Sequence, residues 1–327
     1  MFDSTKPPVF ADVQAAAQRI APYVVETPLL ENLQLNERLG GRVFLKVEAL
    51  QRTGSFKIRG AANRIALIPE SQRQGGVVAF SSGNHAQGVA LAARQFGIPA
   101  LIVMPKDAPR AKVDGTKSYG AEVVFYDRLK DDREAIGQRI AGERGATLVK
   151  PFDDAGVMAG QGTIGLEIAR QAPVALDAVL VPCSGGGVVT GVALALSGAS
   201  PGTRTISVEP EHFDGMRRSL WAGERATAPG GALSIADALM APTPGVVPFA
   251  VAKGLLGEGL AVGDAELAAA VAYAARTLKL IIEPGGTAGL AALLAGRLDV
   301  HGRSVCVVLT GGNADFETVA RCVAEAS

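Results

Sequence analysis

Short, almost uninterrupted apolar runs recur along the chain, each bounded by Gly, Pro or Asp. They occupy residues 76–80, 100–105, 122–126, 178–183, 205–210 and 304–310. A strand with one solvated face alternates apolar and polar residues, whereas a strand buried on both faces is apolar throughout. These runs therefore predict strands in sheets that helices cover on both sides. A further run at 43–50 predicts a half-buried strand.

Helical patterns separate these strands, at residues 84–96, 131–143, 162–171 and 264–280. Strands that alternate with helices are typical of α/β proteins with mainly parallel sheets. The chain shows no internal repeat, low-complexity segment or flexible linker. Any division into two domains must therefore come from the path of the chain rather than from a break in the sequence.

Composition favours an enzyme that acts on a small molecule. The chain has 327 residues, 48% of them hydrophobic, which is enough for a large core and for two domains. Its 32 basic and 32 acidic residues balance, which argues against a nucleic-acid or anionic-membrane surface. Cys183, Cys306 and Cys322 fit neither a disulfide framework nor a metal cluster. Because the N-terminus has no signal-peptide pattern, we expect a cytoplasmic location.

Lys57 lies in the segment SFKIRG, residues 55–60. It follows a Thr-Gly-Ser turn, begins a predicted helix and has Phe56 and Ile58 as neighbours. Most lysines are solvated surface residues, which is one interpretation of Lys57. Partly apolar surroundings would instead favour the neutral amine, which can attack a carbonyl and form an imine. This second interpretation requires a binding site for the carbonyl compound elsewhere in the chain.

Three strand-to-helix junctions carry residues suited to such a site: FSSGNHAQG at 80–88, PCSGGGVVTG at 182–191 and LTGGNADFE at 309–317. Ligands of open α/β sheets bind where strands end and helices begin. The first loop suits a carboxylate or phosphate, although it would also make an ordinary helix cap. The glycines of the second let backbone N–H groups surround a phosphate. Thr310, at a strand end, could bind a ring nitrogen or only nearby backbone.

An imine-forming lysine, a phosphate loop and a hydroxyl at a strand end together describe a pyridoxal phosphate site. The motifs that carry the comparison are TGSFKIRGA, SSGNHAQG, AGQGT, SGGG, VEP, IADAL, IIEPGG and TGGN. In this order, and over essentially the whole chain, they resemble the serine/threonine dehydratase and serine racemase family of fold-type II pyridoxal phosphate enzymes. The resemblance implies the tryptophan synthase β-like fold, with a large cofactor-binding domain at 1–70 and 152–327 and a small mobile domain at 71–151. We also expect a homodimer.

The resemblance implies a role for each matching residue. Lys57 would bind the cofactor as an imine and later remove the substrate's α-proton. Phe56 would lie against the pyridine ring, Asn84 would hydrogen-bond its 3-hydroxyl, and Thr310 would contact its nitrogen. The phosphate loop would begin with Ser184, where the family has glycine, and continue with Gly185, Gly186, Gly187 and Val188. The loop over the substrate carboxylate would comprise Ser81, Ser82, Gly83 and His85.

These roles imply β-elimination. Thr310, unlike an aspartate, would not hold the ring nitrogen protonated, so expulsion of a β-hydroxyl would be favoured over transamination. L-3-Hydroxy amino acids such as L-threonine and L-serine would then give a 2-oxo acid and ammonia. The chain ends soon after its last predicted core helix, which predicts no regulatory domain and no feedback control by isoleucine.

The divalent-cation site of the family is incomplete in this sequence. Glu209 matches its first acid and Phe213 the residue that contributes a backbone carbonyl. Gly215 stands where the family has a second acid. We therefore expect weak binding of Mg²⁺, Ca²⁺ or Mn²⁺ unless Asp214 or Glu211 substitutes.

Other functions stay open at this point. Arg133 could bind the second carboxylate of threo-3-hydroxyaspartate, which would make that compound the substrate, or it could be a solvated helix arginine. Ser82 matches the second acid/base of the racemases, so serine racemase with side dehydratase activity is another alternative; its other role would be to bind the substrate carboxylate. Outside enzymes, the alternative is a protein that binds a phosphorylated metabolite through the SGGG loop alone.

Overall fold

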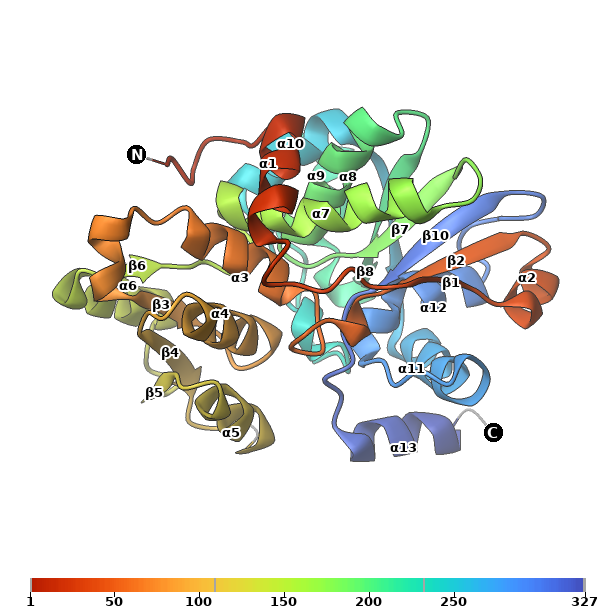
Figure 1. Cartoon of the computed structure of the whole chain (residues 1–327). Coiled ribbons are helices and arrows are strands. Elements are labelled where there is room, and N and C mark those ends of the chain that lie inside the picture. Colours follow the sequence, from red (N-terminus) through yellow and green to blue (C-terminus); the bar gives the residue numbers. More distant parts are fainter. Residues whose placement is uncertain (1, 109, 232, 326–327) are drawn as a thin grey trace.

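Two helix-covered sheets make up the core of the computed structural model, which describes residues 2–108, 110–231 and 233–325 (Figure 1). The strands are β1 (Leu29–Glu31), β2 (Arg42–Val47), β3 (Val77–Phe80), β4 (Ala100–Pro105), β5 (Glu122–Tyr126), β6 (Thr147–Leu148), β7 (Ala178–Pro182), β8 (Arg204–Pro210), β9 (Leu256–Val262) and β10 (Ser304–Leu309).

The α-helices are α1 (Phe10–Ile20), α2 (Leu33–Leu39), α3 (Lys57–Ala66), α4 (Asn84–Gln95), α5 (Arg110–Ser118), α6 (Arg133–Arg144), α7 (Ala155–Gln171), α8 (Gly187–Ala199), α9 (Gly215–Ala222), α10 (Val246–Leu255), α11 (Asp264–Tyr273), α12 (Ala288–Leu294) and α13 (Phe316–Glu325). Short 3-10 helices include η1 (Glu48–Leu50), η4 (Asp237–Leu239) and η6 (Pro284–Thr287). In the described part of the chain, no helix has both the length and the apolarity needed to cross a membrane.

The sheets are almost entirely parallel. The larger has the strand order β1-β2-β10-β7-β8-β9, with only β1 antiparallel to its neighbour. The smaller has the order β5-β4-β3-β6 and is parallel throughout. This confirms the predicted α/β class. The smaller sheet takes its strands from one continuous part of the chain, whereas the larger takes them from both sides of that part. The domain boundaries at 71 and 151, and the mobility of the small domain, stay predictions.

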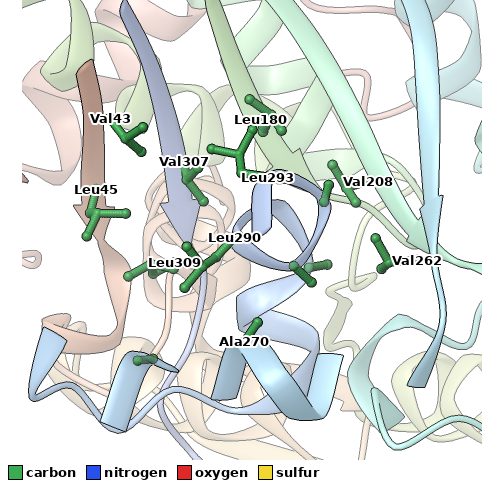
Figure 2. Close-up of a cluster of buried hydrophobic side chains, with 14 of the residues drawn as sticks. Val43, Leu45, Leu180, Val208, Val262, Ala270, Leu290, Leu293, Val307 and Leu309 are labelled. Atoms are coloured by element: carbon green, nitrogen blue, oxygen red, sulfur yellow. The ribbon is translucent and has the colours of Figure 1, made fainter. Parts of the chain in front are cut away.

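Both faces of the larger sheet are packed. In β10, Val307 and Leu309 pack with α11 and α12 in the cluster drawn in Figure 2. Cys306 and Val308 of the same strand point the other way and pack with α7 to α10. Successive residues of such a strand point to opposite faces, and both faces are buried. Every position is therefore apolar, which explains why the strand sequences are continuous apolar runs. All three cysteines are buried and free.

Three elements differ from the sequence predictions. The strand expected at 43–50 ends at Val47, and it is fully buried rather than half buried, Lys46 included. The helix expected at 162–171 begins seven residues earlier, because the Asp154 side chain accepts the N–H of Val157 and caps it. The helix expected at 264–280 ends as an α-helix at Tyr273 and continues as a π-helix over Ala274–Leu278. In addition, β1, β6 and β9 were not predicted. The first two have only three and two residues, and glycines and Glu258 interrupt the apolar pattern of β9.

Candidate active site

A cavity of about 490 Å³ lies where β3, β7 and β10 end and the segments that follow them begin. All the residues predicted to bind cofactor or substrate line this cavity: Phe56, Lys57, Ser81, Ser82, Gly83, Asn84, His85, Arg133, Ser184, Gly185, Gly186, Gly187, Val188 and Thr310. Glu209 and Phe213, predicted for a cation, are not among the lining residues. The loops at the carboxyl ends of parallel strands thus converge on one site.

Lys57 is the first residue of α3, and its side chain lines the cavity. Its Nζ donates a hydrogen bond to the backbone carbonyl of Pro151 at 2.9 Å and lies 5.1 Å from the centre of the Phe56 ring. Burial lowers the pKa of Lys57 to about 8, against an opposing effect of Glu283. A neutral, nucleophilic amine is therefore accessible near neutral pH.

A buried network of ion pairs fixes the first turn of α3. Arg59 binds the carboxylates of Glu48 and Glu167 through two N–H groups each, at 2.6 to 2.9 Å. Lys46 binds Glu167 at 2.6 Å and the backbone carbonyl of Thr27 at 2.6 Å. All four charged side chains are buried. Since Arg59 lies two residues after Lys57, this network holds the helix that presents the amine.

The glycine loop between β7 and α8 approaches other parts of the chain closely. A Cβ at Gly185 would lie 2.3 Å from the Phe152 ring, and one at Gly186, whose φ is +95°, would lie 2.5 Å from Met216. The loop leads into the N-terminus of α8, where unpaired backbone N–H groups attract an anion. The Ser184 hydroxyl accepts the N–H of Ala241 at 3.1 Å, which leaves its own proton for a ligand.

The loop after β3 combines an unpaired hydroxyl with a neutral histidine. Among the described residues, none forms a hydrogen bond with the Ser82 hydroxyl. Nε2 of His85 lies 2.9 Å from the carbonyl of Val149, which can only accept, so Nε2 carries the hydrogen and Nδ1 does not. Burial, followed by the charge of Lys57, lowers the pKa of His85 to about 3. The imidazole is therefore neutral at working pH.

Three further cations line the cavity, and one has no acidic partner. Lys112 pairs with Asp237 at 2.7 Å, and Arg128 pairs with Asp107 at 2.8 Å. Arg133, the first residue of α6, lies with its guanidinium 5.6 Å from the centre of the Phe80 ring. No acid in the described ranges forms an ion pair with it. Its charge is therefore available to a ligand.

Sequence reasoning missed several lining residues, above all Glu283. Its carboxylate is buried and accepts a hydrogen bond from the Asn84 side chain at 2.6 Å. Burial, then the charge of Asp237, raises the pKa of Glu283 to about 7. A signal was present, because an acid in the apolar segment IIEPGG is unusual. Phe152, Lys112 and Asp237 carry no comparable signal, since their positions depend on how distant segments pack.

The residues matched to a cation site do not fit one. Both oxygens of Glu209 accept backbone N–H groups at the start of α9, from Met216 at 2.9 Å and Arg217 at 2.8 Å. Asp214 is held in ion pairs with Arg217 and Arg218. A Cβ at Gly215 would lie 2.5 Å from the backbone oxygen of Pro242, so no acid fits there. Within the described residues, no cluster of three His, Cys, Asp or Glu side chains could hold a metal ion.

Comparisons with known proteins agree on one family. A family model described as pyridoxal-phosphate dependent enzyme matches residues 20–311. The L-threo-3-hydroxyaspartate ammonia-lyase of a Pseudomonas species is 43% identical over 311 residues, which cover 95% of this chain and 97% of that protein. The L-threonine ammonia-lyase of Thermotoga maritima is 42% identical over 312 residues, which cover 95% of this chain and 77% of that protein. The solved structure of maize serine racemase has a TM-score of 0.92 and 37% identity, and the match covers 98% of both chains.

Proposed function

Because the chain belongs to the pyridoxal-phosphate dependent enzyme family, we propose that it eliminates the β-hydroxyl of L-3-hydroxy amino acids such as L-threonine and L-serine. The products are a 2-oxo acid and ammonia. The chain has the fold-type II architecture, and its cofactor is pyridoxal phosphate. The observation that carries the proposal is the amine of Lys57, which has a pKa of about 8 and lines the same cavity as the glycine loop before α8.

The residues of the cavity fit this cofactor. The N–H groups at Gly185 to Gly187 and the Ser184 hydroxyl would bind its phosphate, because they lie at the N-terminus of α8. The close contact of Gly185 with Phe152 leaves no room for a side chain at that position. Phe56 would pack on its ring, Asn84 would donate to its 3-oxygen and Thr310 would bind its nitrogen. When bound, the cofactor withdraws electrons from the α-carbon and makes the α-proton acidic.

Lys57 would move that proton. Its lowered pKa makes the neutral amine a competent base near pH 8, and the carbonyl of Pro151 accepts one of its hydrogens and orients Nζ. The N–H groups and hydroxyls of residues 81–85 would hold the substrate carboxylate at the start of α4. His85, which stays neutral, would contribute no proton transfer.

A second candidate substrate is threo-3-hydroxyaspartate, and Arg133 is the observation that favours it. This substrate carries a second carboxylate, and a guanidinium can bind a carboxylate through two parallel hydrogen bonds. Arg133 lines the cavity, and no described acid forms an ion pair with it. Serine racemisation is a further candidate, because Ser82, with its unpaired hydroxyl, lines the same cavity as Lys57.

A substrate panel tests the function and its second candidate together. We expect 2-oxo acid release from L-serine, L-threonine or threo-3-hydroxyaspartate. If Arg133 binds a second carboxylate, Arg133→Met lowers kcat/KM for hydroxyaspartate by about 30-fold or more, and that for L-serine by less than about fivefold. Arg139→Met is the matched control, because Arg139 lies on the same helix and pairs with Glu143 at the surface.

Each outcome of the panel is decisive. Failure to release 2-oxo acid from any 3-hydroxy amino acid would contradict the proposed function. An equal loss for both substrates in Arg133→Met would contradict selection of the second carboxylate. The configuration of L-serine recovered from the same reactions measures racemisation.

Removal of divalent cations should leave activity largely intact. Glu209 is already bonded to the start of α9, and Gly215 has no room for an acid, so a hard cation would lack most of its ligands. We expect a change of less than about twofold after dialysis against a chelator. A large loss that Mg²⁺, Ca²⁺ or Mn²⁺ restores would show that Glu209 recruits other acids.

We also propose the homodimer and the cytoplasmic location expected from the sequence. Sedimentation equilibrium measures the first directly.

A further inference from the structure

The carboxamide of Asn84 is held from two sides by segments distant in the sequence. Its Oδ1 accepts a hydrogen bond from Nδ2 of Asn313 at 2.7 Å, and its Nδ2 donates to Oε1 of Glu283 at 2.6 Å. Asn313 in turn donates to the backbone carbonyl of Thr53 at 2.7 Å. Hydrogen bonds thus link Thr53 to Asn313, Asn313 to Asn84, and Asn84 to Glu283. Asn84 and Glu283 line the cavity.

The direction of every hydrogen bond in this chain follows from its first member. A backbone carbonyl can only accept, so the atom of Asn313 that faces Thr53 must be the amide nitrogen. That nitrogen then faces the oxygen of Asn84, which turns the nitrogen of Asn84 towards Glu283. One N–H of Asn84 is bonded to the carboxylate, and the other is left for a ligand in the cavity.

Two glycines make room for this arrangement. A Cβ at Gly311 would lie 2.3 Å from Oε1 of Glu283 and 3.2 Å from Nδ2 of Asn84. A Cβ at Gly54, whose φ is +68°, would lie 2.4 Å from Oδ1 of Asn313. Any larger residue at Gly311 would therefore displace the carboxylate from Asn84. The loop sequences are compatible with the hydrogen-bonded chain because both positions lack a side chain.

We propose that Glu283 is a positioning residue for the cofactor: through Asn84 it fixes one N–H donor at the cofactor's 3-oxygen and places a carboxylate behind that donor. The inference rests on the proposed function, which puts this oxygen next to Asn84. The bond that the Asn84 oxygen accepts from Asn313 polarises the amide and strengthens its N–H groups as donors, whereas Glu283 fixes the orientation of the amide. The position of the donor and the charge next to the 3-oxygen both then depend on Glu283.

Cofactor affinity and the absorption spectrum of the bound cofactor test this role. We expect Glu283→Ala to raise the dissociation constant of pyridoxal phosphate about tenfold or more, because Asn84 loses the partner that orients it. Glu283→Gln keeps an acceptor of the same shape, so the dissociation constant should stay within about threefold of wild type. Above about pH 8, where Glu283 with its pKa of about 7 is ionised, the ratio of the visible to the near-ultraviolet absorption band should nevertheless change, because glutamine places no charge behind Asn84.

Glu266→Ala is the matched control. The Glu266 carboxylate accepts hydrogen bonds too, from a backbone N–H and an arginine, but it lies outside the active-site cavity. The Glu266→Ala protein should be less stable than the wild type but should show the same cofactor affinity and the same absorption spectrum. If Glu283→Ala does not fold, Asn313→Asp takes its place. An aspartate there presents an acceptor to Asn84, turns its amide round and withdraws the N–H from Glu283. We then expect weaker cofactor binding and a changed ratio of the two absorption bands, because the N–H of Asn84 that faced the ligand is displaced.

Different results would overturn the proposed function and the role of Glu283. A protein that binds no pyridoxal phosphate and releases no 2-oxo acid would overturn the proposed function. A protein that does both, and in which Glu283→Ala or Asn313→Asp changes affinity and spectrum no more than Glu266→Ala, would overturn the role of Glu283 alone.

Discussion

Lys57→Ala is expected to lower turnover of every substrate by at least about 10³-fold, because both the covalent attachment of the cofactor and the removal of the α-proton would be lost at once. Lys112 is the other lysine among the described lining residues, but its ammonium is held by Asp237 at 2.7 Å. It therefore cannot replace Lys57. Lys57→Arg should be as inactive, since a guanidinium does not lose its proton near neutral pH and forms no imine.

Borohydride reduction provides the measurement that separates this assignment from a folding defect. Reduction of the wild type should fix the cofactor on Lys57, and the alanine variant should keep its circular dichroism but carry no label. Lys253→Ala is the matched control, because Lys253 lies over the Phe249 ring much as Lys57 lies over Phe56, but on the exposed side of α10. Substantial 2-oxo acid release by Lys57→Ala would refute the role of this lysine.

Arg59→Met should be among the most destabilising single substitutions in the chain. It leaves the carboxylates of Glu48 and Glu167 buried without the guanidinium that binds both. Removal of one partner from a buried ion pair costs about 3–5 kcal/mol of unfolding free energy, chiefly because the remaining charge is uncompensated. Arg59 itself resists deprotonation: burial alone would lower its pKa, but the two carboxylates raise it.

A surface pair offers the control for this measurement. Arg42 binds Glu31 through two N–H groups, as Arg59 binds Glu48, but the Arg42 side chain is 44% exposed. Arg42→Met should cost no more than about 1 kcal/mol in urea unfolding. The double variant Arg59→Met with Glu48→Gln should recover part of the loss, because Glu48 is then neutral, whereas Glu167 keeps its ion pair with Lys46. If Arg59→Met were no less stable than Arg42→Met, the network would not stabilise α3.

The fold could be predicted well where the local pattern was unambiguous. The runs that became β4, β7 and β10 were recognised from continuous apolar sequence, since burial on both faces leaves no polar position. The run that became β5 also forms a strand, but this strand lies at the edge of the smaller sheet and is partly exposed rather than buried on both faces. The helix start at Asn84 was recognised from the serines and glycine that turn the chain before it. The start of α7 was missed because its first eight residues, AGVMAGQG, are rich in glycine and are stabilised by tertiary packing rather than by propensity.

Motifs in the sequence predicted which residues make up the candidate site, but not how these residues are arranged in space. Lys57, the glycine loop and Thr310 were each chosen because their chemistry matches one part of pyridoxal phosphate, and the structure brings them to one cavity. Their individual roles stay predictions. Apolar neighbours in the sequence made a depressed pKa one of two interpretations of Lys57, and the burial of its side chain in the folded chain favours that interpretation. Whether an acid pairs with Arg133 could not be predicted, because that depends on which distant groups pack nearby.

By itself, the sequence determined the α/β class, the parallel sheets and the residue types of a pyridoxal phosphate site, because each of these is encoded in a few consecutive residues. Only the tertiary structure decided that Glu283 and Asn313 hold the Asn84 side chain, that Glu209 accepts backbone N–H groups at the start of α9, and that Arg59 bridges two buried acids. The partners of Asn84 are 199 and 229 residues away, and Arg59 and Glu167 are 108 residues apart. Hydrogen bonds and ion pairs act over a few ångströms in space, and no local pattern records which distant residues folding brings within that range.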